Sequence, residues 1–106
     1  MKRKIGIYEI LNNVNGKRYI GQSINIRDRL SNHKCQLTRV TRSKDCNRHL
    51  YNAVYKYGIR SFSFNIVEEW TADKLDEREL YWINYFNTTN RDFGYNLRTD
   101  IGGRVS

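Results

Sequence analysis

The chain has 106 residues, enough for one domain with a single hydrophobic core and too few for two. Its 39% hydrophobic and 28% charged residues, without proline or low-complexity tracts, exclude a disordered chain. No apolar run reaches the roughly 18 residues that a membrane span needs, and two cysteines do not make a disulfide framework. We therefore expect an intracellular protein with reduced thiols and no membrane partner.

Positive charge is concentrated in the first part of the chain. Lysine and arginine number 19 against 11 acidic residues, which gives a net charge of +8. Residues 1–60 hold 14 basic and 3 acidic side chains, whereas residues 61–106 hold 5 basic and 8 acidic ones. A basic surface favours a polyanionic partner, usually nucleic acid. The alternative is a solvated surface that only aids solubility.

Two strands are predicted near the start of the chain. Alternating residues with high strand propensity cover 5–11 and 18–23. Asn15-Gly16 between them is a strong hairpin-turn signal, because both residue types tolerate positive φ. A turn centred there pairs Tyr19 with Asn12 across the hairpin.

The two faces of this hairpin differ in chemistry. One face carries Gly6, Tyr8, Tyr19 and Gly21, and the other carries Ile5, Ile7, Leu11 and Ile20. We expect the aliphatic face to pack on the core. The glycines predict room on the tyrosine face for another backbone or a ligand. Two ordinary strand tyrosines with two tolerated glycines are the alternative.

Helical spacing begins after residue 23. Asn25 is predicted to cap a helix whose apolar stripe contains Ile26, Leu30, His33 and Leu37. The pattern then predicts a polar loop over 38–46, a helix over about 47–57, a strand over 62–70, a helix from 71 or 73 to 86, and a turn-rich tail over 87–106. This order predicts a single-domain α+β fold, a small three-stranded antiparallel sheet flanked by three helices.

One carboxylate lies in the apolar arc of the last predicted helix. At about 100° per residue, Glu79 falls between the positions of Leu75 and Ile83. A carboxylate there is unfavourable unless it is paired, hydrogen-bonded or bound to a metal. A structural salt bridge with a nearby arginine is one explanation, and a functional acid is the other.

Two arginines of the first predicted helix suit a phosphate ligand. Arg29 flanks the apolar stripe one turn before His33, and Arg27 lies on the same helix. A guanidinium donates two parallel hydrogen bonds to a phosphate, which matches its planar fork. Most surface arginines are only solvated, so neither residue is decisive alone.

A set of ordered motifs resembles the GIY-YIG nuclease family, closest to its phage and intron homing-endonuclease branch. Gly6-Ile7-Tyr8 is followed after ten residues by Tyr19-Ile20-Gly21. Further matches are Arg29 eight residues after Gly21, His33 four residues later, Lys56-Tyr57-Gly58, Glu79 and Gly94-Tyr95-Asn96. The resemblance covers about residues 4–98, so we expect a nuclease domain over 1–98 and a tail over 99–106.

The resemblance implies hydrolysis of DNA phosphodiester bonds with one divalent cation, Mg²⁺ or Mn²⁺. It implies that Glu79 holds the metal and that Arg29 stabilises the developing charge. Tyr8 is the candidate general base ahead of His33, although an unperturbed phenol with a pKa near 10 is a poor base. Tyr19 would position water or phosphate, and Asn96 would hydrogen-bond within the site.

Basic residues of the helices and the loop would bind backbone phosphates without reading sequence. These residues are Arg27, Lys34, Arg39, Arg42, Lys44, Arg48 and Lys56.

Three alternatives remain at this stage. A non-catalytic nucleic-acid-binding domain would keep the basic surface without needing Glu79. A restriction or repair nuclease would use the same site in another role. A zinc module would use four ligands, His33, Cys35, Cys46 and His49. On one helix, however, His33 and Cys35 point about 200° apart, which does not suit a tetrahedral zinc site.

Overall fold

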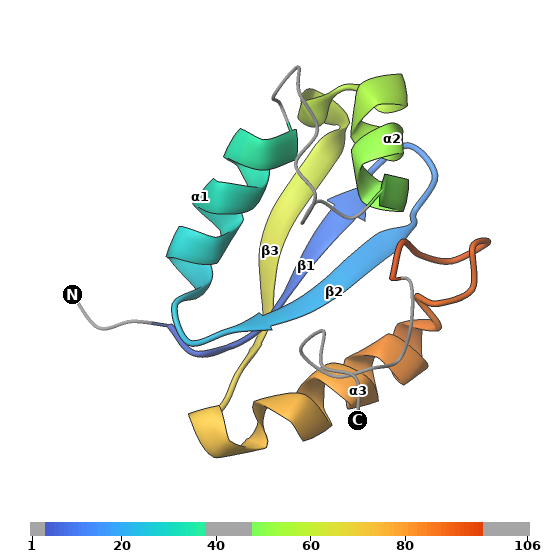
Figure 1. Cartoon of the computed structure of the whole chain (residues 1–106). Coiled ribbons are helices and arrows are strands. Elements are labelled where there is room, and N and C mark those ends of the chain that lie inside the picture. The colour runs from blue at the N-terminus through green and yellow to red at the C-terminus, as the bar shows by residue number, and fades with distance from the viewer. Residues whose placement is uncertain (1–3, 38–47, 97–106) are drawn as a thin grey trace.

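The computed structural model describes residues 4–37 and 48–96, shown in colour in Figure 1. The elements are β1 (Gly6–Asn12), β2 (Arg18–Ser23), α1 (Ile26–Leu37), α2 (Arg48–Tyr57), η1 (Ile59–Ser61), β3 (Phe62–Glu69), η2 (Ala72–Lys74) and α3 (Leu75–Phe86). The predicted element order and the α+β fold class are confirmed. The predicted loop over 38–46 and the last ten residues of the tail lie outside the described residues.

The three strands form one antiparallel sheet in the order β2-β1-β3. Helices α1 and α2 lie on one face of this sheet and α3 lies on the other (Figure 1). None of the helices within 4–37 and 48–96 is long and apolar enough to cross a membrane.

Both faces of the sheet are buried. The face under α1 and α2 packs Tyr8 and Ile10 against Ile26 and Leu50. The face under α3 packs aliphatic side chains from strands and helix, namely Ile7, Ile20, Leu75 and Ile83. The expectation that the isoleucine face packs on a core is confirmed. The tyrosine face is largely covered, however, because two helices lie over it and Tyr8 is only 1% exposed. Tyr19 on the same face stays partly exposed.

The predicted centre of the hairpin turn was wrong by one residue. Tyr19 pairs with Ile10 rather than Asn12, and Tyr8 pairs with Gly21. The amide of Asn12 donates to the carbonyl of Lys17 at 2.9 Å, which closes a four-residue loop over 13–16. The side-chain oxygens of Asn12 and Asn15 accept from the Val14 and Lys17 amides, and such local bonds set the loop. The resulting shift in pairing spans two residues, an even number, so the predicted faces are confirmed.

Local signals also explain where the helices begin and end. The Asn25 side-chain oxygen accepts from the Asp28 amide at 3.4 Å, which confirms the predicted cap of α1. Helix α3 begins at Leu75, later than predicted, because the short turn η2 occupies Ala72–Lys74. It ends at Phe86 as predicted, where Asn87 adopts a left-handed φ of 55°.

Candidate active site

A tyrosine and a histidine meet inside the layer between α1 and the sheet. The hydroxyl oxygen of Tyr8 on β1 lies 2.8 Å from Nε2 of His33 on α1. Both side chains are buried, with 1% and 8% exposure. Tyr19 on β2 completes the group, with its ring centroid 6.4 Å from Tyr8 and 5.7 Å from His33. Three elements therefore bring three predicted site residues together.

Gly21 makes room for this arrangement. Tyr8 and Gly21 are direct partners across β1 and β2, and the Tyr8 hydroxyl crosses the place where a Cβ of residue 21 would lie. Any side chain at this position would collide with the phenol ring. The predicted room beside Gly21 exists, but the protein's own tyrosine occupies it.

Burial sets the protonation states of this pair. It raises the pKa of the Tyr8 phenol well above its usual range, Tyr19 adds to the rise, and Arg29 opposes it. Burial also lowers the pKa of His33 to about 4, and the positive charge of Arg29 contributes in the same direction. Near pH 7 the histidine is therefore neutral and the phenol keeps its proton.

Arg29 brings a positive charge to the edge of this pair. It lies on the exposed side of α1, one turn before His33, and its guanidinium donates a hydrogen bond to Tyr8. Burial disfavours its charge, but Tyr8 and Tyr19 outweigh that effect and raise its pKa overall. A fixed cation beside a buried hydroxyl suits an anionic ligand such as a phosphate.

Glu79 lies on the opposite face of the sheet. Leu75, Glu79 and Ile83 form the buried stripe of α3, and Glu79 is only 7% exposed. Its predicted place in the apolar arc is confirmed. Its Oε1 accepts a hydrogen bond from Nε2 of Gln22 at 3.0 Å, whereas the neighbouring Arg78 pairs with Glu68. The charge of Glu79 also reaches Tyr8, whose pKa it raises.

Gln22 is a site residue that the sequence reasoning missed. Its amide nitrogen donates to Glu79 and, at 2.8 Å, to Asp76 of the same helix. A signal was present, because strand alternation puts residue 22 on the face of Ile20, where an amide is as unusual as Glu79. A polar residue on the aliphatic face of a strand and one in the apolar arc of a helix are candidates for contact with each other.

The carboxylate oxygens of Glu79 and Asp76 are ligands that suit a Mg²⁺-like cation better than zinc. Within the part of the chain that the structure describes, no three His, Cys, Asp or Glu side chains gather to hold a metal by themselves. Mg²⁺ needs no such cage, since one or two carboxylates suffice beside waters and substrate phosphate. The zinc alternative finds no support, because His33 contacts Tyr8 and Cys35 is exposed.

Asn96 holds the outer edge of β2. Its side-chain oxygen accepts from the Ile20 amide at 2.8 Å, and its side-chain nitrogen donates to the Ile20 carbonyl at 2.9 Å. Just before it, the amide of Tyr95 donates to the carbonyl of Arg18. Asn96 thus fixes the strand segment between Tyr19 and Gly21 from outside.

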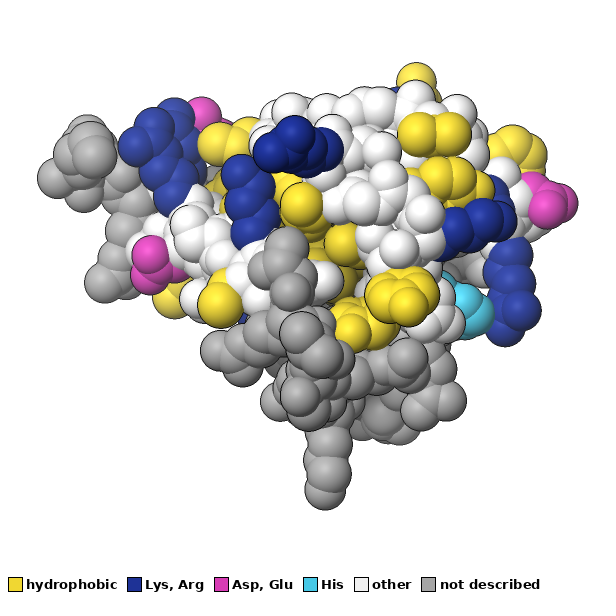
Figure 2. All heavy atoms as spheres, turned by 90° about the horizontal axis from the view of Figure 1, so that it is seen from above, with side chains coloured by type: hydrophobic (Ala, Val, Ile, Leu, Met, Phe, Trp, Pro, Cys, Tyr) yellow, Lys and Arg dark blue, Asp and Glu magenta, His cyan; other side chains and the backbone are white. Residues whose placement is uncertain are grey.

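The predicted phosphate-binding residues divide into two groups. Arg27, Lys34 and Lys56 are exposed on α1 and α2. Arg39, Arg42 and Lys44 lie outside the described residues, as does the side chain of Arg48. Figure 2 shows Lys and Arg side chains in several separate groups among exposed hydrophobic ones, with few acidic side chains on that face.

Comparison with known proteins agrees with this fold. The profile of the GIY-YIG catalytic domain matches residues 4–96, so the chain belongs to that family of nuclease domains. It is 34% identical over 97 residues to a probable intron-encoded endonuclease 1 of Neurospora crassa, a match that covers 85% of this chain. The match covers 30% of that relative, so this chain spans under a third of its length.

Two solved structures share the fold. The catalytic domain of the homing endonuclease I-TevI has a TM-score of 0.76 and 31% identity, over 90% of this chain and 99% of that domain. A variant of the I-TevI catalytic domain with a glutamate replaced by alanine has a TM-score of 0.79 and 30% identity, over 94% and 99% of the two chains. The predicted resemblance to the homing-endonuclease branch is confirmed.

Proposed function

We propose that this chain is the catalytic domain of a metal-dependent, homing-type endonuclease that hydrolyses DNA phosphodiester bonds at one site. The observation that carries the proposal is the buried Tyr8–His33 hydrogen bond beside the Arg29 cation, within electrostatic reach of the Glu79 carboxylate. A proton acceptor, a cation and a carboxylate are the groups that phosphodiester hydrolysis requires.

In this proposal Tyr8 and His33 activate the attacking water together. Burial makes Tyr8 a poor base by itself, because its pKa is raised rather than lowered. The neutral Nε2 of His33, 2.8 Å away, accepts the phenol proton while the phenol oxygen takes a proton from water. The sequence ranks Tyr8 ahead of His33 as the general base, and in this proposal the two residues form one relay in which the tyrosine contacts water.

Arg29 and Tyr19 act on the phosphate. The exposed guanidinium of Arg29 donates to the phosphate oxygens, on which negative charge increases in the transition state. The half-buried Tyr19, whose ring contacts both Tyr8 and His33, positions the water or the phosphate. Exposed Arg27, Lys34 and Lys56, with Arg39, Arg42, Lys44 and Arg48, bind neighbouring phosphates of the DNA.

Glu79 holds the divalent cation, and Gln22 orients the carboxylate through its amide. When bound, Mg²⁺ or Mn²⁺ supplies Lewis-acid stabilisation of the phosphate and leaving oxygens. Asn96 supports the site indirectly, since it keeps the backbone between Tyr19 and Gly21 in register. Each proposed group therefore has a contact that explains its position.

The test is plasmid cleavage by purified protein. We expect the wild type to nick supercoiled plasmid in Mg²⁺ and not in EDTA, and Glu79→Ala and Arg29→Ala to lose that activity. Glu77→Ala and Arg91→Ala are matched controls, because both side chains are exposed, and they should cleave normally. A Glu79→Ala protein that cleaves like the wild type would contradict the proposal and favour a non-catalytic DNA-binding domain.

A further inference from the structure

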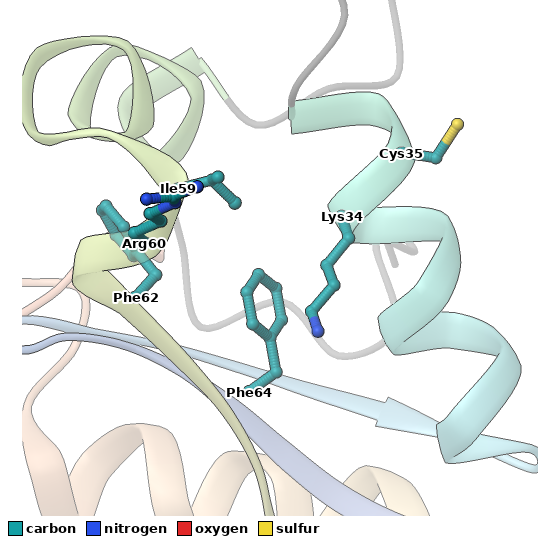
Figure 3. Close-up of a pocket in the computed structure, with 6 residues that line it drawn as sticks. All are labelled: Lys34, Cys35, Ile59, Arg60, Phe62 and Phe64. Atoms are coloured by element: carbon teal, nitrogen blue, oxygen red, sulfur yellow. The ribbon is translucent and has the colours of Figure 1, made fainter.

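An open hollow lies over β3, between α1 and η1 (Figure 3). Its volume is about 610 Å³, which falls within the range of small-molecule sites, roughly 300–1,000 Å³. The residues that line it are Lys34, Cys35, Ile59, Arg60, Phe62 and Phe64. None of the groups proposed above for water activation or metal binding lines it.

The lining combines flat apolar surface with positive charge. Phe64 points up into the hollow between the two walls (Figure 3), and it is only partly buried. The ammonium of Lys34 lies 5.0 Å from the centroid of its ring, and the exposed Arg60 lies on the η1 side. Among the described residues of this lining none is acidic. Such a surface suits a flat apolar ring that carries a negative charge.

The hollow is a neighbour of the Tyr8–His33 pair. Phe64 is the strand partner of Ile10, two residues from Tyr8 on the same face of the sheet, and Lys34 follows His33 on α1. In the order β2-β1-β3 the hollow lies over β3, whereas Tyr8 and Tyr19 belong to β1 and β2. Strands are about 4.8 Å apart, so the two places are separated by about the length of a few nucleotides at roughly 3.4 Å per step.

We propose that this hollow binds one unstacked nucleotide of the DNA strand that the active site cuts, a proposal that rests on the proposed function. The base stacks on Phe64, and Lys34 and Arg60 bind the adjoining phosphates. When the base stacks on Phe64, it takes the place of the Lys34 ammonium over the ring, and the ammonium then pairs with a phosphate. Because a base inside a regular duplex is not free to stack here, the domain prefers DNA with an unpaired nucleotide over a perfect duplex.

The first test measures binding of a hexanucleotide that contains one 2-aminopurine, in EDTA so that cleavage is absent. Stacking of the base on Phe64 quenches its fluorescence. We expect Phe64→Leu to weaken binding at least about fivefold, since base–aromatic stacking contributes that much or more. Phe64→Trp should retain binding. Tyr85→Leu is the matched control, because Tyr85 is exposed on α3 on the other side of the sheet.

The roles of the two basic side chains that line the hollow are tested with the same oligonucleotide. Lys34→Gln and Arg60→Gln should each weaken binding severalfold and reduce its dependence on salt. Lys74→Gln on η2 is the control and should change neither quantity. Equal binding by wild type, Phe64→Leu and Phe64→Trp would overturn the proposal, as would tighter binding of a perfect duplex than of the same duplex with one bulged base.

Plasmid cleavage separates the two proposals. Phe64-dependent binding without Mg²⁺-dependent nicking supports the pocket alone, and nicking without Phe64 dependence supports the nuclease alone.

Discussion

Each face of the sheet buries a polar group within an apolar core, and the two cores differ in composition. Under α1 and α2, the polar Tyr8–His33 pair interrupts a core of aliphatic and aromatic side chains. Under α3, Glu79 and Gln22 interrupt a core of isoleucine and leucine. In each case the buried polar group is hydrogen-bonded. The Tyr8–His33 pair and the Glu79 carboxylate thus lie in separate layers, yet the charge of Glu79 still raises the pKa of Tyr8.

Strand β2 contributes side chains to both of these layers. Strand alternation places Tyr19 on the His33 side of the sheet and Gln22 on the Glu79 side. Gly21 between them has no side chain, so the Tyr8 ring lies directly over it. The charge of Glu79 also acts on the Tyr8 hydroxyl, whose pKa it raises. The comparison therefore predicts that each layer can be altered separately, while changes in β2 affect both.

The largest effect is expected from Glu79→Leu. The proposed cleavage should fall about 10³-fold, as expected when a preorganised charge is lost. Stability should rise by about 1 kcal/mol, because leucine completes the apolar stripe of α3. Rates on plasmid and urea unfolding measure the two quantities, and Glu77→Leu at an exposed position is the control. A large loss of stability would show that the carboxylate is needed for folding.

His33 should give the next largest effect and a distinctive pH dependence. His33→Gln still accepts a hydrogen bond but cannot take a proton, so cleavage should fall about 10²-fold. Its neighbours are Tyr8 on β1, Tyr19 on β2 and Arg29 on its own helix. In the wild type, cleavage should not decline near pH 6.5 and should fall near pH 4.

The pH dependence of stability should also reflect the titration of His33. The unfolded chain binds a proton at His33 near pH 6.5 and the folded chain only near pH 4. The free energy of unfolding should therefore decrease as pH falls between these values, by about 3 kcal/mol, and not decrease further below them for this reason. Urea unfolding of wild type and His33→Gln at several pH values isolates the contribution, which the variant should lack.

Gly21→Ala tests whether β2 must leave room for the Tyr8 ring. The new methyl group would collide with the Tyr8 ring, so we expect a stability loss of about 1–3 kcal/mol. Displacement of Tyr8 from His33 should lower cleavage about tenfold or more. Gly16→Ala is the contrasting variant, because Gly16 has a φ of +78° but no atom within 4 Å of the added methyl group. It should lower stability by about 1 kcal/mol and leave the cleavage rate unchanged.

The parts of this comparison that follow from periodicity were predictable from sequence. Strand alternation placed Tyr8 and Tyr19 on one face, and helical spacing placed Glu79 on the buried stripe of α3. Both depend only on the repeat of one element. The family motifs then supplied the candidate site residues as a set.

The parts that depend on distant contacts were not predictable in the same way. The hairpin pairing was misplaced because the side chains of Asn12 and Asn15 form a four-residue loop, and a local dipeptide signal does not include them. The 2.8 Å contact between Tyr8 and His33 depends on how α1 packs over the sheet. Likewise, the partner of Asn96 was hidden because it lies 76 residues away, at Ile20.

Asn96→Ala should give the smallest effect and show how β2 is held. The substitution removes two hydrogen bonds to the Ile20 backbone, so unfolding free energy should fall by about 1–3 kcal/mol. Cleavage should fall only severalfold, in kcat rather than KM, because the residue positions the strand and does not contact DNA. Asn65→Ala is the control, since it removes an exposed hydrogen bond to Glu9 on β1 and should change kcat little. If Asn96→Ala raises KM with kcat unchanged, the amide contacts the substrate directly, and β2 does not depend on it for its place between the two layers.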